Sequence, residues 1–394
     1  MDAANQSIFL SSNTSQFIGT TLSSSLLTNP SADHALLRYA TQPPASFSGA
    51  SLFRITLPST PADLTLALKL TANLDPLRTK QIHRFQHSMH RELGAWISCP
   101  IDWTQPLNQA PSPINAPSNT LLRDPKSGSW ELMHWLPGTI IPHVGLASQP
   151  QILSLATHLA RFHRSAQHYT HHSPCTARHD HRLRDRLERL LAATQDKFAK
   201  QRAQLSSIAS KSSHLDVHKC AQAIERCQQI ASATLRPLQS LEQRIRNSPE
   251  KFCFWGHGDA WRGNWLFAGD QVTGLLDFAQ ADCRWQGFDF ARAFGSLLLE
   301  ADHSPANASS TYANGEAAWF SAWNAYTAEF PSPSFCLNDA RCMHYVSTVL
   351  TFCIFLDNWV NQELPAHRLN RFDEILTALL HFQPINVTCQ CRTD

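Results

Sequence analysis

The stretch from Phe254 to Gly295 constrains the fold of this chain more than any other segment. Its polar landmarks are Asp259, Asn264, Asp277 and Asp289. Residues 265–276 contain two short apolar runs on either side of a turn, which is the pattern of a β-hairpin. Such a hairpin would bring Asn264 and Asp277 to the same edge, although thirteen residues separate them. The fold must therefore support a group of carboxylate and amide side chains at one end of a hairpin.

The run from His257 to Asn264 reads H-G-D-A-W-R-G-N, which has the H-x-D-x-x-x-x-N spacing of a protein-kinase catalytic loop. Phosphoryl transfer requires in-line positioning and neutralisation of phosphate charge. Asp259 would orient and deprotonate an attacking hydroxyl, and Asn264 and Asp277 would give Mg²⁺ the oxygen ligands that it prefers. The alternative is that Asp259 is only a turn residue and Asp277 only caps a helix.

Asp289 precedes an apolar run, residues 290–299, that predicts a helix. The aspartate is therefore interpreted either as the N-cap of that helix or as a residue that holds the catalytic loop in shape.

An upstream segment has the layout of a phosphate-covering loop followed by its lysine. Four small residues come first, Ser48, Gly49, Ala50 and Ser51. Strands are predicted at 52–57 and 64–70, and the alternation of leucines in the second strand places Lys69 on the opposite face. The alternative is that Lys69 is the solvent-facing residue of an edge strand.

A helix is predicted from Asp75-Pro76 onward, to about residue 97. A kinase places in this helix the glutamate that pairs with its strand lysine. The only glutamate here is Glu92, late in the helix, whereas Gln86 lies nearer the expected level. Either the pair is absent or another group holds Lys69.

The rest of the chain divides at a strand, residues 130–135, that ends in a Pro-Gly turn typical of a hinge. Residues 99–129 are loop-like, and residues 181–247 predict two or three helices broken at 206–213 and at Pro237. The predicted organisation is a weakly ordered leader (1–35), an ATP-binding lobe (36–135), a catalytic and substrate lobe (136–385) and a tail (386–394).

Composition excludes several classes of protein. With 394 residues, a net charge of +2 and 43% hydrophobic residues, the chain is ordinary for a globular enzyme and shows no concentrated basic surface for nucleic acid. No apolar run is long enough to span a membrane, and the N-terminus is a poor signal peptide. The eleven cysteines include no C-x-x-C pair, so reduced thiols and a cytoplasmic location are expected. The oligomeric state stays open.

Residues 168–181 are rich in histidine, and His168 and His172 could share a helix face. Pro174 interrupts the segment and no further ligand completes a recognised set, so a solvated loop is favoured over a metal site.

The stretch 257–292 resembles the aminoglycoside phosphotransferase/choline kinase family. Its H-G-D-x-x-x-x-N, I-D-F and D-x-A blocks are matched by H-G-D-A-W-R-G-N, L-D-F and D-F-A. The resemblance extends more weakly over residues 40–380 and departs at Trp261-Arg262. It implies an α+β, bilobal protein-kinase-like fold with a small β-rich N-lobe and a larger, mainly helical C-lobe.

The resemblance also implies roles for individual residues. Asp259 is expected to be the catalytic base, and Asn264 and Asp277 the Mg²⁺ ligands. Lys69 is expected to contact the ATP phosphates. The segment Ser48–Ser51 would form the covering loop, and the backbone of Glu131 and Met133 would touch adenine.

The expected function is an ATP- and Mg²⁺-dependent transfer of the γ-phosphate to a hydroxyl of a small molecule. Aminoglycosides are less expected because residues 161–189 contain seven arginines against three acids, the wrong sign for a polycation. The alternatives are a protein Ser/Thr kinase of the same fold and a nucleotide-binding pseudokinase. The missing partner of Lys69 motivates the pseudokinase, whereas the intact set of Asp259, Asn264 and Asp277 argues against it.

Overall fold

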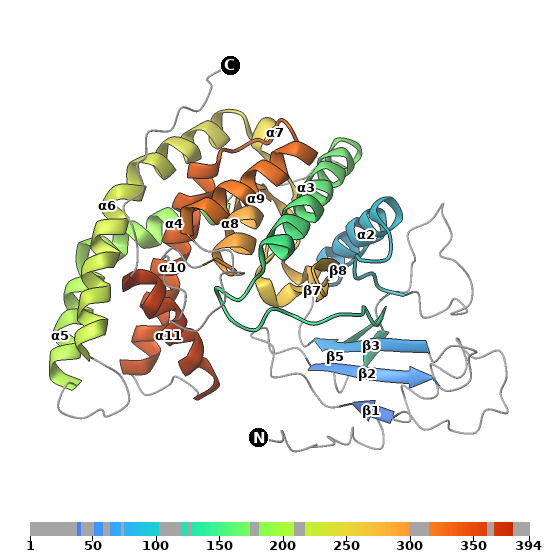
Figure 1. Cartoon of the computed structure of the whole chain (residues 1–394), viewed down its shortest axis with the longest axis horizontal. Coiled ribbons are helices and arrows are strands. Elements are labelled where there is room, and N and C mark those ends of the chain that lie inside the picture. The colour runs from blue at the N-terminus through green and yellow to red at the C-terminus, as the bar shows by residue number, and fades with distance from the viewer. Residues whose placement is uncertain are drawn as a thin grey trace. The chain divides into compact units, whose positions relative to one another are not determined.

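The computed structural model describes residues 38–40, 51–57, 64–71, 75–101, 120, 122–124, 128–173, 181–208, 217–298, 315–360 and 366–380. The chain forms two compact units (Figure 1). The first unit contains Met1–Gly138 and Thr273–Ala279, and the second contains Thr139–Val272 and Gln280–Asp394. The predicted leader, the predicted tail and three residues of the expected covering loop (Ser48, Gly49 and Ala50) lie outside the described residues.

An antiparallel sheet with the strand order β1-β2-β3-β5-β4 dominates the first unit. Its strands are β1 (Arg38–Ala40), β2 (Ser51–Leu57), β3 (Leu64–Thr71), β4 (Leu122–Asp124) and β5 (Gly128–His134). The strands expected at 52–57, 64–70 and 130–135 are confirmed by β2, β3 and β5. In the register of β3 with β5, Lys69 lies directly opposite Glu131.

Helix α2 (Pro76–Leu93) begins where the sequence indicates, but it ends at Leu93, before the expected residue 97, with Gly94 as its C-cap. The side chain of Asp75 caps it by accepting the backbone N–H of Leu77 at 2.9 Å, and Pro76 occupies the first turn. The helix buries Ile82, Phe85 and Met89, which recur at helical spacing. It therefore presents one apolar face to the first unit.

The predicted hairpin is present as β7 (Trp265–Ala268) and β8 (Gln271–Leu275). The chain enters the first unit at Thr273, within β8. There Leu275 exchanges backbone hydrogen bonds with the segment after α2, donating to Trp96 at 2.8 Å and accepting from Ser98 at 3.0 Å. This pairing brings Asp277 into the unit that contains Lys69.

The second unit is mainly helical. Its helices are α3 (Gln149–His172), α4 (His181–Ala192), a π-helical turn (Ala193–Lys197), α5 (Phe198–Ile208), α6 (Val217–Asn247), α7 (Pro249–Phe252), α8 (Gly287–Gly295), α9 (Gly315–Glu329), α10 (Leu337–Val360) and α11 (Ala366–Leu380). Helix α3 packs against α9, and α6 packs against α10 and α11. Strands β6 (Cys253–Gly256) and β9 (Asp282–Trp285) form a short antiparallel pair; β6 comes directly before the H-G-D-A-W-R-G-N loop, and β9 follows the β7–β8 hairpin.

The break expected at Pro237 is wrong, because α6 runs through this proline (Figure 1). Proline removes one backbone donor from a helix and is normally disfavoured inside it. Here Ile230, Leu238 and Leu241 on the same helix are buried. Burial on both sides of the proline outweighs the local preference.

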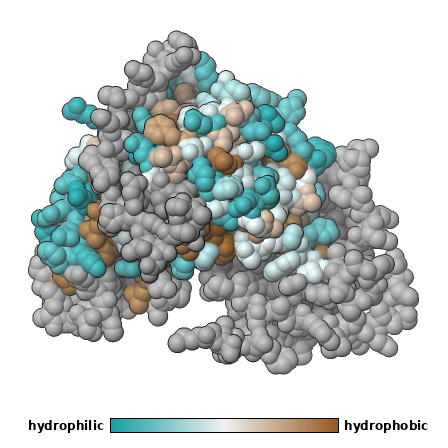
Figure 2. All heavy atoms as spheres, in the orientation of Figure 1, coloured by the Kyte–Doolittle hydropathy of each residue, from teal (hydrophilic) through white to brown (hydrophobic). Residues whose placement is uncertain are grey.

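The described surface of the second unit is mixed. On the face shown in Figure 2, hydrophilic side chains alternate with small apolar patches. Large apolar side chains with substantial exposure, such as Phe320 and Ile354, lie on different helices. Within the described ranges, every helix is too short or too polar to cross a membrane.

The expectation that the cysteines are reduced thiols is wrong at one position, because Cys283 in β9 is disulfide-bonded. Seven other cysteines in the described part of the chain are free. Six of those seven are buried, which makes them small apolar residues of the core. Reduced cysteines were one reason to expect a cytoplasmic location, and this reason is weakened by the disulfide at Cys283. The cytoplasmic location stays a prediction.

Candidate active site

Lys69 lies between two carboxylates of the first unit. Its Nζ donates to Oδ1 of Asp277 at 2.7 Å, and Glu131 faces it across the sheet. Burial lowers the pKa of Lys69, but the charges of Asp277 and Glu131 outweigh burial and raise the pKa above its ordinary value. Lys69 is therefore a partly buried ammonium group that bonds to Asp277 and is stabilised by the charge of Glu131, and the alternative of a solvent-facing edge residue is wrong.

Glu131 is held in turn by helix α2. The Nε2 of His83 donates to Oε1 of Glu131 at 2.5 Å, and Nδ1 of His83 contacts the hydroxyl of Thr120 at 2.5 Å. Burial raises the pKa of Glu131, yet His83 and Lys69 reverse this effect and lower the pKa below its ordinary value. Glu131 is thus an ionised, buried carboxylate at the end of a hydrogen-bond chain that begins on α2.

This arrangement answers the question left open about the partner of Lys69. Glu92 is exposed, and Gln86 donates to the carbonyl of Ser98 at 3.0 Å, so neither residue serves Lys69. The helix supplies a histidine, and the carboxylate comes from β5 instead. The sequence of β5 alone could not predict that Glu131 takes the place of a helix glutamate, because the register between β3 and β5 decides which residue lies opposite Lys69.

Asp277 has an unusual backbone. Its φ is 56°, the only positive value of a non-glycine residue in the described ranges. Aspartate tolerates this left-handed conformation better than most residues. The next residue, Phe278, packs edge-on against Phe85 of α2 with ring centroids 6.2 Å apart. Asp277 therefore lies between strand β8 and Phe278, which packs on α2, and its carboxylate accepts from Lys69.

In the second unit, Asp289 holds the loop that carries Asp259. Its carboxylate accepts the backbone N–H groups of His257 and Gly258, each at 2.7 Å. Burial raises the pKa of Asp289, but its contacts with His163 and the charge of Arg284 outweigh burial and lower it. Helix α8 begins after Gln286, so the expectation of an N-cap is wrong and the loop-holding role is confirmed.

Gly258 is required at its position. Its φ is 79°, and a Cβ there would lie 2.1 Å from the guanidinium of Arg284 and 2.2 Å from the carbonyl oxygen of Gln280. The same guanidinium donates to the carbonyl of Gly258 at 3.1 Å. A side chain at this position would displace the loop just before Asp259.

Asp259 is held by two neighbours. The Nε of Arg292, one turn after Asp289 on α8, donates to Oδ1 of Asp259 at 3.1 Å. The amide nitrogen of Asn264 donates to the carbonyl of Asp259 at 2.7 Å, which leaves the amide oxygen of Asn264 for another partner. About a third of the Asp259 side chain is exposed. The carboxylate is therefore oriented but accessible.

Arg262, within the same loop, is buried and anchors it to three segments. Its backbone N–H donates to the hydroxyl of Ser296 at 2.7 Å, and its guanidinium donates to the carbonyl of Pro142 at 3.1 Å. The same guanidinium donates to Glu374 of α11 at 2.9 Å. The departure at Trp261-Arg262 thus brings a structural arginine into the loop, and Arg292 is a second loop-holding residue that sequence reasoning missed.

The other expected site residues have the following positions. Ser51 begins β2. Glu131 and Met133 lie within β5, where Met133 also bridges Pro100 on the other side of the strand. Their contact with adenine, and the role of Ser51, stay predictions.

The described part of the histidine-rich segment offers no metal site. His168 and His172 share a face of α3, with ring centroids 4.7 Å apart. Among the described residues, no three or more His, Cys, Asp or Glu side chains are grouped so that they would hold a metal ion.

Comparisons with known proteins show the family and the fold. The model of the phosphotransferase enzyme family matches residues 78–331. A solved amicoumacin kinase, in complex with AMP-PNP, Ca²⁺ and Ami, is 12% identical with a TM-score of 0.51, over 89% of this chain and 92% of that one. An aminoglycoside phosphotransferase from Alicyclobacillus acidocaldarius is 12% identical with a TM-score of 0.50, over 88% and 91%. No curated protein matches the sequence. At this identity the structural likeness shows the fold, and it confirms a protein-kinase-like α+β fold with a β-rich N-lobe and a mainly helical C-lobe.

Proposed function

Because the chain belongs to the phosphotransferase enzyme family, we propose that it transfers the γ-phosphoryl group of ATP to a hydroxyl of a small molecule. The observation that carries the proposal is the construction of the loop around Asp259. Two backbone hydrogen bonds to Asp289, and the guanidinium of Arg292, fix an accessible carboxylate in one orientation. A carboxylate fixed in this way is what a positioned general base requires.

In the proposed reaction Asp259 accepts the proton of the acceptor hydroxyl. The hydroxyl oxygen forms a bond to the γ-phosphorus, the bond from that phosphorus to the bridging oxygen breaks, and ADP leaves with the electron pair. Arg292 keeps the carboxylate aligned with the hydroxyl through its contact at 3.1 Å. Because the contact uses only Oδ1, the other carboxylate oxygen is assigned to the acceptor.

Lys69 is proposed to bind the phosphates of ATP. An ammonium group balanced by two carboxylates keeps its charge and a fixed direction, which favours phosphate recognition. The pseudokinase alternative rested on a missing acidic partner for Lys69, and this reason no longer applies because Asp277 and Glu131 both stabilise the charge of Lys69.

Asn264 and Asp277 are proposed to hold Mg²⁺, and their donor groups fit this ion. The amide oxygen of Asn264 is not the atom that contacts Asp259, and the carboxylate of Asp277 already accepts a cationic group, the ammonium of Lys69. Carboxylate and amide oxygens are the hard ligands that Mg²⁺ selects. When bound, the ion neutralises negative charge on the phosphates.

The test is a coupled ADP-release screen with MgATP over hydroxylated metabolites, aminoglycosides and a generic protein substrate, together with thermal melting. We expect MgATP to raise the Tm more than Mg²⁺ or ATP alone, and a small-molecule acceptor to stimulate ADP release. No shift of the Tm at millimolar MgATP would contradict the proposal. Stimulation by the protein substrate alone would favour the Ser/Thr kinase alternative.

A further inference from the structure

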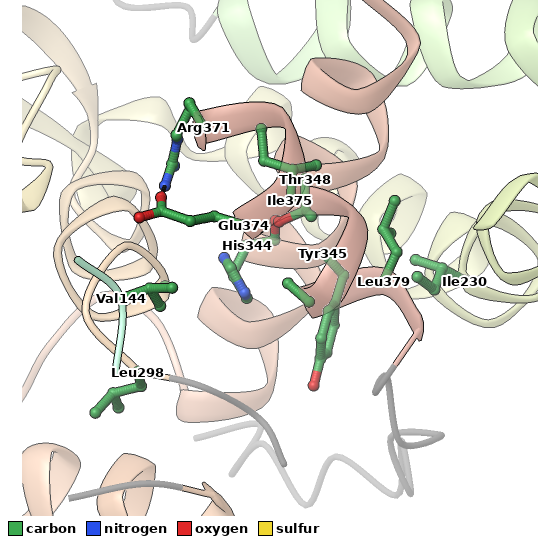
Figure 3. A pocket seen from close by; sticks show the side chains of 12 residues that line it. Val144, Ile230, Leu298, His344, Tyr345, Thr348, Arg371, Glu374, Ile375 and Leu379 are labelled. Carbon is green, nitrogen blue, oxygen red and sulfur yellow. Dashed lines mark hydrogen bonds and ion pairs between the residues drawn. The ribbon is translucent and has the colours of Figure 1, made fainter. Parts of the chain in front are cut away.

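A cavity in the second unit is lined by Glu374, whose carboxylate accepts from Arg262 of the loop that carries Asp259. It encloses about 30 Å³, enough for one or two water-sized groups and too little for a whole sugar. Helix α10 contributes His344 and Thr348 to its wall, and α11 contributes Arg371 and Glu374 (Figure 3). Leu298, just after α8, closes another side. The cavity therefore suits one end group of a larger ligand.

Arg371 and Glu374 line the cavity, and Arg262, which does not line it, bonds to the same Glu374 carboxylate. Arg371 donates to Oε2 of Glu374 at 2.7 Å, and Arg262 donates to the same carboxylate at 2.9 Å. Arg262, Arg371 and Glu374 expose only 5%, 22% and 15% of their side chains. His143 also contacts Glu374, at 3.2 Å, from an exposed position. Among the described residues, one carboxylate thus balances two cations, and a positive charge is left over in a poorly solvated place.

The neighbouring ion pairs do not remove this excess. Arg292 is matched by Asp259 at 3.1 Å, and Arg341 is matched by Glu316 at 2.8 Å. Each of these pairs is neutral. An unbalanced charge out of water is costly, and a bound anion would compensate it.

The pKa of His344 is lowered by burial and by nearby arginines. Its imidazole lies against Trp319, with ring centroids 5.7 Å apart, and lines the cavity beside Glu374 (Figure 3). Burial, and then the charges of Arg371, Arg341 and Arg292, lower the pKa of His344 to about 3. The ring is therefore neutral near pH 7 and keeps one N–H to donate.

We propose that this cavity receives a carboxylate or phosphate group of the acceptor, so that the acceptor is a small hydroxylated acid. The inference rests on the proposed function. Arg371 supplies the charge and His344 a neutral donor for the anion. Arg262 ties the cavity wall to the loop between Asp259 and Asn264, which places the ligand's end group next to the loop that would activate its hydroxyl. A polycation would meet the same excess positive charge and be repelled.

The anion site is tested by thermal melting with inorganic phosphate or acetate at constant ionic strength, in the presence of saturating MgADP. We expect both the wild type and Arg184→Gln to be stabilised by at least one of the two anions. Arg184 is the matched control because it pairs with Glu188 on α4 and both side chains are exposed. Arg371→Gln should need roughly tenfold more anion for the same shift, the size expected from one charge-assisted hydrogen bond, and Arg371→Lys should lie between. Equal shifts in Arg371→Gln and the wild type would overturn the site.

The acceptor class is tested with gluconate, sorbitol, sorbitol 6-phosphate and glucamine, which share a polyol chain and differ in the charge of one end group. ADP release should be faster with one of the anionic compounds than with sorbitol or glucamine by about tenfold or more, and Arg371→Gln should lose this preference. A wild-type preference for sorbitol or glucamine, or no release with either anion while the anion shift persists, would overturn the acceptor class. A wild type that does not bind MgATP would instead contradict the proposed function, since the anion titration does not depend on turnover.

Discussion

Glu131 of β5, and not a glutamate of α2, is the acid that lies opposite Lys69, and the variant Glu131→Gln tests this assignment. The change keeps the shape of the side chain and removes its charge. It weakens the charge-assisted hydrogen bond from His83, which contributes about 1.5–3 kcal/mol in a typical protein. Removing one partner of a buried ion pair can cost about 3–5 kcal/mol, but Lys69 keeps Asp277 at 2.7 Å, so the lower range applies. We expect the free energy of unfolding to fall by about 2 kcal/mol.

The same variant should weaken ATP binding. With Glu131 neutral, the ammonium of Lys69 keeps its hydrogen bond to Asp277 but loses the second negative charge that stabilises it. We expect the KM for ATP to rise roughly fivefold to tenfold, equivalent to about 1–1.4 kcal/mol, with a smaller change in kcat. The measurements are urea unfolding and ADP-release kinetics at pH 7.5. His83→Gln keeps a donor near Glu131 and should show a smaller effect in both assays.

Glu92→Gln is the matched control. It removes the same charge from an exposed position late in α2 and should change stability by less than about 0.5 kcal/mol. If Glu92→Gln raised the KM for ATP and Glu131→Gln did not, the helix glutamate would be the partner of Lys69 after all. The assignment of that role to β5 would then be refuted.

Three further predictions concern the loops and the cavity. Gly258→Ala should lower the free energy of unfolding by more than about 2 kcal/mol in denaturant titration. Gly269→Ala is the control, because Gly269 has a φ of 57° but no atom within 4 Å of the added Cβ, and it should lower the free energy of unfolding by only about 1–2 kcal/mol. Equal losses in the two variants would contradict the close approach of Arg284 to Gly258. Asp277→Asn should weaken binding of MgATP by about tenfold more than it weakens binding of metal-free ATP in calorimetry, and an unchanged Mg²⁺ dependence would rule out the metal role. His344 has a pKa of about 3 in the folded protein and its ordinary pKa of 6.5 in the unfolded chain. Its contribution to stability is therefore present above pH 6.5 and is lost as the pH falls from 6.5 towards 3, by up to about 1.4 kcal/mol per pH unit. His344→Gln should flatten the dependence of stability on pH in that window, and an unaltered dependence would show that the ring is not buried as described.

Local sequence patterns were sufficient to predict much of the fold. The strand around Lys69 alternates leucines with polar or small residues, and Asp75-Pro76 begins α2 with a capping side chain. The hairpin that leads to Asp277 has apolar runs on either side of a turn. In each case neighbours in sequence determine the backbone, so pattern and structure agree.

The residues that sequence reasoning missed depend on contacts between distant segments. Glu131 faces Lys69 because of the register of β5, and His83 reaches it from a helix 48 residues earlier in the chain. Arg262 is buried because Glu374, 112 residues later, balances its charge. Pro237 stays inside α6 because tertiary packing outweighs the local preference. No short-range pattern contains this information.

The central claim is that Asp259 is the base of a phosphotransferase, and the variant Asp259→Asn tests it most directly. We expect the rate of acceptor-dependent ADP release to fall by at least about 100-fold, the usual contribution of a general base, while the Kd for MgATP changes by less than about twofold in the same preparation. Asp185→Asn, an exposed acid paired with Arg189 on α4, should behave as the wild type in both measurements. An Asp259→Asn enzyme that retains more than about a tenth of the wild-type rate would contradict the account.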